Sequence, residues 1–98
     1  MRVELRAEAR RDLMEGAWFY DGQRAGLGEY FVDSVLNDIS LLATQAGIHE
    51  VVYGFHCKPA KRFPFAIYYL VDDTAGIVVV IAVLDCRQDP QRVADRLR

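Results

Sequence analysis

The sequence predicts an α+β domain with the element order β-α-α-β-β-β, a mostly antiparallel sheet packed by an N-terminal helical hairpin and followed by a short C-terminal helix. Two observations predict this fold. Apolar residues recur at steps of three and four between residues 8 and 46, which is typical of helices. From residue 50 onward, apolar and aromatic residues form short runs separated by turn residues, which is typical of strands.

Length and composition indicate a single globular domain over residues 1–98. A chain of 98 residues suits one domain and is too short for two ordinary ones. Hydrophobic residues make up 52% and charged residues 27%, which provides enough apolar material for a core and argues against disorder. A net charge of −2 argues against a general polyanion binder. Residues 57–98, with seven Lys or Arg and five Asp, are the more basic part.

The sequence also predicts a cytoplasmic protein that needs no membrane, metal or cofactor. Residues 1–6 alternate charged and apolar side chains, unlike a signal peptide. The longest apolar run, Ile77 to Leu84, has eight residues and is too short to cross a bilayer. Cys57 and Cys86 match no standard zinc spacing, even with His56 beside them, so two free thiols are expected.

The N-terminal half should form a short strand and two antiparallel helices. Residues 2–6 alternate as a half-buried strand does, and a helix is expected over residues 8–24. The glycines of residues 25–28 end that helix, and a second helix should run over residues 27–46. The apolar stripe of the second helix covers about half its circumference, which favours packing against both the first helix and a sheet.

The C-terminal half should form three strands and a terminal helix. A strand is expected over residues 50–55 with a bulge at Gly54, a second over 60–71, and a buried central strand over 77–84. Residues 72–76 form the hairpin loop between the last two. If the hairpin is symmetric, Arg62 lies opposite Asp85 and Phe65 opposite Ala82, so Arg62 and Asp85 would pair. Asp89 and Pro90 then start a short helix.

Five short motifs follow one another along the chain. They are Ala9-x-x-Asp12-Leu13, Phe19-Tyr20-Asp21, Gly26-Leu27-Gly28-x-x-Phe31, Arg62-Phe63-Pro64-Phe65-Ala66-Ile67-Tyr68-Tyr69, and the apolar run 77–83 leading into Arg87-x-Asp89-Pro90 and Arg96. In this order they resemble the ParE/RelE superfamily of toxins, whose R-F-P-Y-x-I-x-Y strand is similar to the fourth motif. The resemblance implies the toxin of a type II toxin–antitoxin (plasmid stabilization) system, neutralised by a cognate antitoxin that wraps it.

The superfamily contains two activities, and the sequence favours the non-enzymatic one. ParE-like members inhibit DNA gyrase, whereas RelE-like members cut messenger RNA at the ribosome, which requires a general acid and base. No Tyr, His, Lys or Trp follows Tyr69. Asp85, Gln88 and Val93 stand where many relatives carry a His, an Arg and an aromatic residue. The resemblance therefore implies a gyrase inhibitor, with an RNA-cleaving toxin or a non-toxic interaction module of the same fold as alternatives.

A basic cluster is the candidate surface for the target. Lys58, Lys61 and Arg62 lead into one strand of the expected hairpin, and Arg87 follows the other, so the four cations should meet at one end of the sheet. They would contact DNA gyrase, or the ribosome and messenger RNA in the alternative. His49 and His56 are seven residues apart, so in one regular strand they would face opposite sides, and only a bulge at Gly54 would bring them together. We expect both to be ordinary loop or strand-end residues.

Exposed aromatic and apolar side chains are the candidate surface for a protein partner. Trp18 and Phe19 lie on opposite flanks of the first helix, and Tyr30 and Leu41 lie outside the main stripe of the second. Such residues are enriched at protein interfaces. We expect them to border the site of an antitoxin helix or a second toxin copy, in a homodimer or a toxin–antitoxin hetero-oligomer. Burial under a loop or the C-terminal tail is the alternative.

Overall fold

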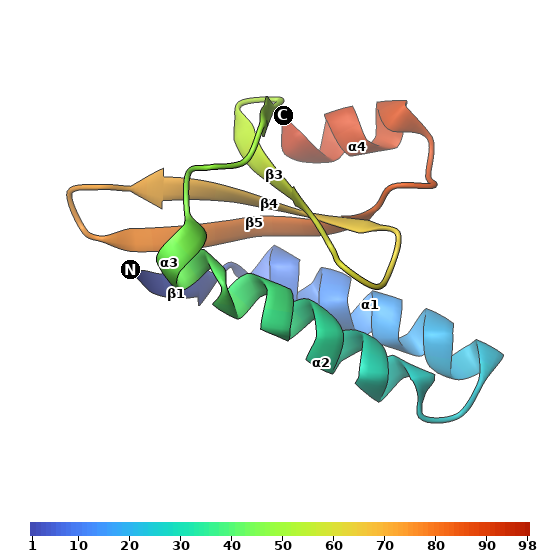
Figure 1. Cartoon of the computed structure of the whole chain (residues 1–98). Helices are drawn as coiled ribbons and strands as arrows, with labels where there is room; N and C mark the ends of the chain where they lie inside the picture. The colour runs from blue at the N-terminus through green and yellow to red at the C-terminus, as the bar shows by residue number, and fades with distance from the viewer.

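A five-stranded sheet forms the middle layer of the molecule, with helices on both faces (Figure 1). The computed structural model describes all residues from Met1 to Arg98. The elements are β1 (Arg2–Leu5), α1 (Ala7–Gln23), α2 (Leu27–Ser40), α3 (Leu42–Gln45), β2 (Val51–Val52), β3 (Phe55–Pro59), β4 (Phe65–Asp72), β5 (Ile77–Asp85) and α4 (Pro90–Leu97). The strand order is β1-β5-β4-β3-β2, and only β1 and β5 are parallel. None of the helices could span a membrane.

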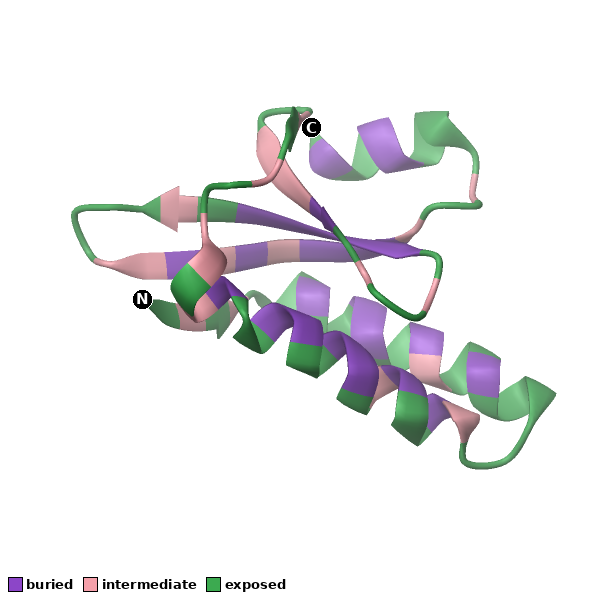
Figure 2. Ribbon diagram, viewed as in Figure 1, coloured by how far each residue is buried: buried purple, intermediate pink, exposed green.

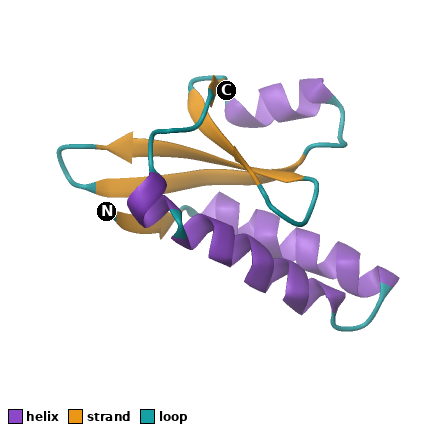
Figure 3. Ribbon diagram, viewed as in Figure 1, coloured by secondary structure: helices purple, strands orange, loops and turns teal.

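The sheet separates two apolar cores, which is why β5 is covered on both faces as predicted. The larger core lies under the hairpin of α1 and α2 and includes Phe31 and Tyr69. The smaller core lies under α4, where Val93 and Leu97 pack on Tyr68 and neighbouring residues. Figure 2 shows buried residues along the strands, and Figure 3 shows the strands between these two helical layers. The predicted α+β class, the helical hairpin and the short C-terminal helix are therefore confirmed.

The expected strand over residues 50–55 is wrong, because Gly54 belongs to a turn and not to a bulge. Tyr53 and Gly54 both have positive φ angles, 53° and 83°, the combination that joins two strands in a tight hairpin. Val51 and Val52 therefore form β2 and pair with His56 and Phe55 of β3. Four strands follow the helices instead of three.

The symmetric register of the next hairpin is also wrong. β4 begins at Phe65 and not at residue 60, and Phe65 lies opposite Asp85 rather than Ala82. A bulge between Tyr68 and Tyr69 leaves Ile81 of β5 without a partner and shifts the register on its far side. The expected pair of Arg62 and Asp85 does not form, because Arg62 lies in the exposed loop that precedes β4.

The second helix ends earlier than predicted. It breaks at Leu41, between α2 and the short α3, instead of running over residues 27–46. The hydroxyl of Ser40 donates to the carbonyl of Asn37 at 2.7 Å, the same oxygen that accepts the Leu41 N–H at 3.3 Å. A serine side chain that competes for a helix carbonyl in this way weakens the helix. The start of α4 is as predicted, with Pro90 in its first turn and Asp89 accepting the N–H of Gln91 at 2.9 Å.

Glycine allows the two long helices to approach each other closely. A Cβ on Gly28 would clash with the backbone carbonyl oxygen of Ala17 and lie 2.7 Å from the Asp21 carboxyl carbon. The Gly28 N–H donates to that carboxylate at 2.7 Å, which satisfies one of the free donors at the start of α2. Gly28 is therefore required where α1 and α2 meet.

Gly28→Ala should destabilise the protein, because backbone must move to admit the methyl group. We expect the free energy of unfolding to fall by about 1–3 kcal/mol. The matched control is Gly22→Ala in α1, where an added Cβ meets nothing within 4 Å. That variant should gain about 0.5 kcal/mol, since Ala favours the helix over Gly. Urea denaturation measures both, and equal effects would contradict the close approach.

Candidate functional site

The structure places Lys58 in the interior and not on a free basic surface. Its side chain is 8% exposed, and its Nζ donates to the carbonyl oxygen of Asp38 near the end of α2 at 2.8 Å. Burial lowers the pKa of Lys58. A cation close to the C-terminal end of a helix is favourably placed against the helix dipole. The carboxylate of Asp38 accepts the backbone N–H of Lys61 at 3.0 Å, which anchors the following loop.

The other three cations of the expected cluster are exposed, and one of them carries an ion pair. Arg87 donates through Nε to Asp85 Oδ1 at 3.0 Å and through an Nη to Asp85 Oδ2 at 2.8 Å, and it reaches the Tyr20 hydroxyl at 3.3 Å. These hydrogen bonds from Arg87 lower the pKa of Asp85, which makes that carboxylate a poor general base. Lys61 and Arg62 lie in the loop before β4, beside the end of β5.

The four apolar candidates for a partner surface are all exposed, but they do not share one site. Trp18, the most exposed at 66%, lines an apolar groove on the helical hairpin. Phe19 lines a separate polar hollow on the other flank of α1. Tyr30 packs against Phe63, with ring centroids 5.7 Å apart. Leu41 lies at the break between α2 and α3.

The groove beside Trp18, here called the hairpin groove, is the most apolar hollow of the molecule. Its volume is about 460 Å³, and it runs between α1 and α2 to the end of β1. It is lined by Leu5, Arg10, Leu13, Met14, Ala17, Trp18, Val32 and Leu36. Arg10 is its one charged residue. Met14, Val32 and Leu36 line this groove, although the sequence did not predict them as partner-surface residues.

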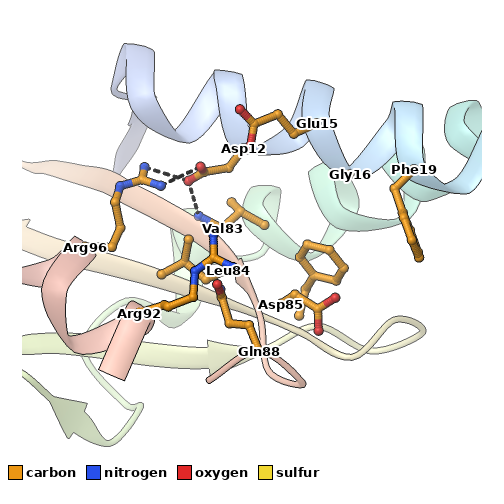
Figure 4. A pocket seen from close by; sticks show the side chains of 11 residues that line it. Asp12, Glu15, Gly16, Phe19, Val83, Leu84, Asp85, Gln88, Arg92 and Arg96 are labelled. Atoms are coloured by element: carbon orange, nitrogen blue, oxygen red, sulfur yellow. Dashed lines mark hydrogen bonds and ion pairs between the residues drawn. The ribbon is translucent and has the colours of Figure 1, made fainter. Parts of the chain in front are cut away.

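A second hollow, here called the edge hollow, lies beside the end of β5 that has no strand paired to it on the β1 side (Figure 4). The pairing of β1 with β5 ends at Leu5 and Val80, but β5 continues to Asp85. The buried carboxylate of Asp12 takes the place of the missing strand, accepting the N–H of Val83 at 3.0 Å. A space of about 420 Å³ remains beside it.

Asp12 also ties the C-terminal helix to α1. Its two oxygens accept hydrogen bonds from the two terminal nitrogens of Arg96 at 2.7 and 2.8 Å. This bidentate geometry is the strongest form of an arginine–carboxylate pair. Glu15, Asp85 and Arg92 add charges of both signs to the wall of the edge hollow, so it favours no one class of ligand.

The two histidines lie together, contrary to the sequence expectation. The tight turn at Gly54 folds the chain back, and both imidazoles contact Tyr69. Nδ1 of His49 lies 2.6 Å from the Tyr69 hydroxyl. The ring of His56 stacks on the Tyr69 ring with centroids 5.0 Å apart, and its Nδ1 lies 2.8 Å from the His49 carbonyl oxygen.

The two cysteines are free thiols. Burial raises the pKa of both Cys57 and Cys86, so neither thiol is activated as a nucleophile. Burial also raises the pKa of Tyr68, a neighbour of Cys57. No three His, Cys, Asp or Glu side chains lie close enough together to hold a metal ion.

The arrangement of a helical hairpin on one face of this sheet and a short terminal helix on the other defines a known class of α+β fold. It is shared with a solved structure described as the chromosomal ParDE TA system from P. aeruginosa. The two chains superpose with a TM-score of 0.72 at 17% sequence identity, over 85% of this chain and 92% of that one. At this identity the likeness shows the fold alone. No family model matches the sequence, and no curated protein matches it either.

Asp12→Asn should destabilise the protein, because it removes the charge that pairs with Arg96 and halves the acceptor capacity at the edge of β5. We expect a loss of about 2 kcal/mol, typical of a part-buried, charge-assisted hydrogen-bond site. Glu15→Gln, one turn further along α1 and exposed, is the control and should change stability by less than about 0.5 kcal/mol. Guanidinium unfolding followed by circular dichroism compares the two, and a neutral Asp12 variant would refute the role given to this carboxylate.

Proposed function

We propose that this protein is the toxin component of a type II toxin–antitoxin system, that a cognate antitoxin holds it through the hairpin groove, and that the free toxin acts by binding and inhibiting DNA gyrase. The observation that carries the proposal is an exposed apolar groove on a fold that is also found in the ParDE TA structure. The five sequence motifs support the same assignment independently of the fold.

The hairpin groove has the chemistry of a helix-binding site. An amphipathic helix is recognised by apolar anchors that enter such a groove. Trp18 and Met14 offer large, exposed apolar contact area, and Leu13 and Val32 form the floor. The single charge at the groove, Arg10, is complementary to an acidic residue of the partner. The proposed occupant is therefore an antitoxin helix with apolar residues on one face and an acid beside them.

The chemistry of the sheet end supports binding rather than cleavage. RNA cleavage needs a general base and acid beside cations that stabilise the phosphate. The carboxylate of Asp85 has a lowered pKa and is occupied by Arg87, and Lys58 is held inside by Asp38. Lys61 and Arg62 remain exposed and suit an acidic protein surface. We therefore assign Lys61, Arg62 and Arg87 to target contact and remove Lys58 from that set.

Trp18→Ala should weaken antitoxin binding while leaving the fold intact, because the side chain is exposed in the free protein. A buried tryptophan anchor at an interface typically contributes about 2 kcal/mol, so the dissociation constant should rise about 30-fold. Phe19→Ala is the matched control, an exposed aromatic on the same helix outside the groove, and should change binding less than about threefold. Titration of labelled antitoxin measures both. Stronger weakening by Phe19→Ala would move the antitoxin to the edge hollow.

Lys61→Ala combined with Arg62→Ala should relieve growth inhibition, since target contact would be lost while the loop stays anchored through its backbone. The matched control is Arg2→Ala with Arg6→Ala, which removes the same charge at the β1 edge of the sheet. Purified proteins are compared for inhibition of gyrase supercoiling and for transcript cleavage on translating ribosomes. Cleavage without gyrase inhibition would favour the RNA-cleaving alternative. Activity in neither assay would favour the non-toxic module.

A further inference from the structure

Three side chains meet where the chain enters the outer edge of the sheet. The ring of Tyr69 is fully buried in β4, and its hydroxyl reaches the segment between α3 and β2. That hydroxyl accepts the backbone N–H of Gly47 at 3.0 Å and lies 2.6 Å from Nδ1 of His49. His56 of β3 stacks on the same ring and is 2.8 Å from the His49 carbonyl oxygen.

The hydrogen-bond partners in this cluster favour one protonation state for each imidazole. A carbonyl oxygen only accepts, so Nδ1 of His56 must carry the proton that it donates to His49. With neutral His49, the Tyr69 hydroxyl accepts from Gly47 and donates its own proton to an unprotonated Nδ1 of His49. A second proton leaves the His56 bond intact. At His49 it sets an N–H donor against the Tyr69 hydroxyl, which already accepts from Gly47 and would lose the acceptor for its own proton.

The surroundings of His49, through burial and neighbouring charges, also oppose its protonation. Burial lowers its pKa most, followed by the nearby cation of Lys58 and then by His56. Lys58 and His56 come from β3 and Tyr69 from β4. On the α2 side the carbonyl of Asp38 holds Lys58, and its carboxylate is engaged by the backbone of the next loop. Glu50, beside His49 in the chain, is the nearest acid of the same segment and is exposed.

We propose that His49, Tyr69 and His56 form an acid-sensitive latch, in which neutral His49 fastens the segment 46–50 to the sheet and its protonation releases that segment together with β2. Apart from these bonds, the side chain of Val52 packs against the smaller core, and few backbone bonds hold β2. It has two residues, which pair with Phe55 and His56, and the only further backbone bond nearby runs from the Cys57 N–H to the Glu50 carbonyl at 2.8 Å. Release would leave the outer edge of β3 open for pairing with another strand.

The direction of the pH effect follows from linkage. Because the pKa of His49 is lower in the folded latch than its ordinary value of 6.5, the open state binds the proton more readily than the closed state. The latch is therefore fully closed above the ordinary value and loosens as the pH falls below it. In that window the equilibrium constant for opening rises by up to about tenfold for each unit by which the pH falls.

Hydrogen exchange of the full chain tests the latch. Amide exchange is followed by NMR between about pH 7.5 and 5, where imidazoles titrate, and corrected for the intrinsic rates. The amides of Gly47 and Cys57 should lose protection as the pH falls, whereas those of β5 should not. In Tyr69→Phe, which keeps the ring and removes the hydroxyl, the two amides should be poorly protected at every pH, without a step.

Histidine variants make the result decisive even if Tyr69→Phe does not fold. His49→Gln should abolish the pH step, because the titrating group is gone. His56→Gln is the matched control and should keep the step, since its bond does not depend on a neutral ring and an amide can replace it. A wild-type protein without the step, or a step that persists in His49→Gln, overturns the proposal.

Discussion

One buried carboxylate joins the layers of this molecule. Asp12 faces the sheet from α1, accepts a backbone hydrogen bond from Val83 in β5, and forms a bidentate ion pair with Arg96 in α4. The helical hairpin, the central strand and the terminal helix therefore converge on two oxygen atoms. Because α4 contributes few apolar side chains to the smaller core, its position depends on this pair more than that of the long helices does.

Several other charged or polar side chains likewise replace main-chain partners that the fold does not supply. Lys58 donates to a carbonyl near the end of α2, and Asp21 accepts one of the first N–H groups of that helix, the N–H of Gly28. Tyr69 accepts the N–H of Gly47 before β2. Buried backbone groups without a partner are costly, so a small domain with short elements needs such substitutes. This requirement removes Lys58 from the set of residues that can serve a target.

The sequence predicts the parts of the fold that depend on hydrophobic periodicity. It does not predict those whose structure is decided by a contact between distant residues. The apolar stripes locate α1 and α2, and the long apolar run locates β5 between two covered faces. Gly54 fits a bulge and a turn equally well, and only the pairing of β2 with β3 decides between them. That turn also unites His49 and His56, so no counting of positions along one strand could have found them.

The exposure of Trp18 was predictable from its place on the flank of a helix, but the hairpin groove beside it was not, since it needs residues from β1, α1 and α2. The charge cluster failed for a related reason. The hairpin is offset by two residues already beside its loop, where Asp72 lies opposite Ile77, and the bulge adds one more, which brings Asp85 opposite Phe65. Arg87, two positions further on, is then the ion-pair partner of Asp85.

The parallel pairing of β1 with β5 has a consequence for biosynthesis. Residues 2–5 cannot pair as a strand until residues 77–80 have been synthesised, and Asp12 cannot form its ion pair until Arg96 has been synthesised. Contacts between such distant parts of a chain form late and slowly. In a nascent chain the apolar faces of α1 and α2 therefore lack their cover until residues 77–96 have been synthesised.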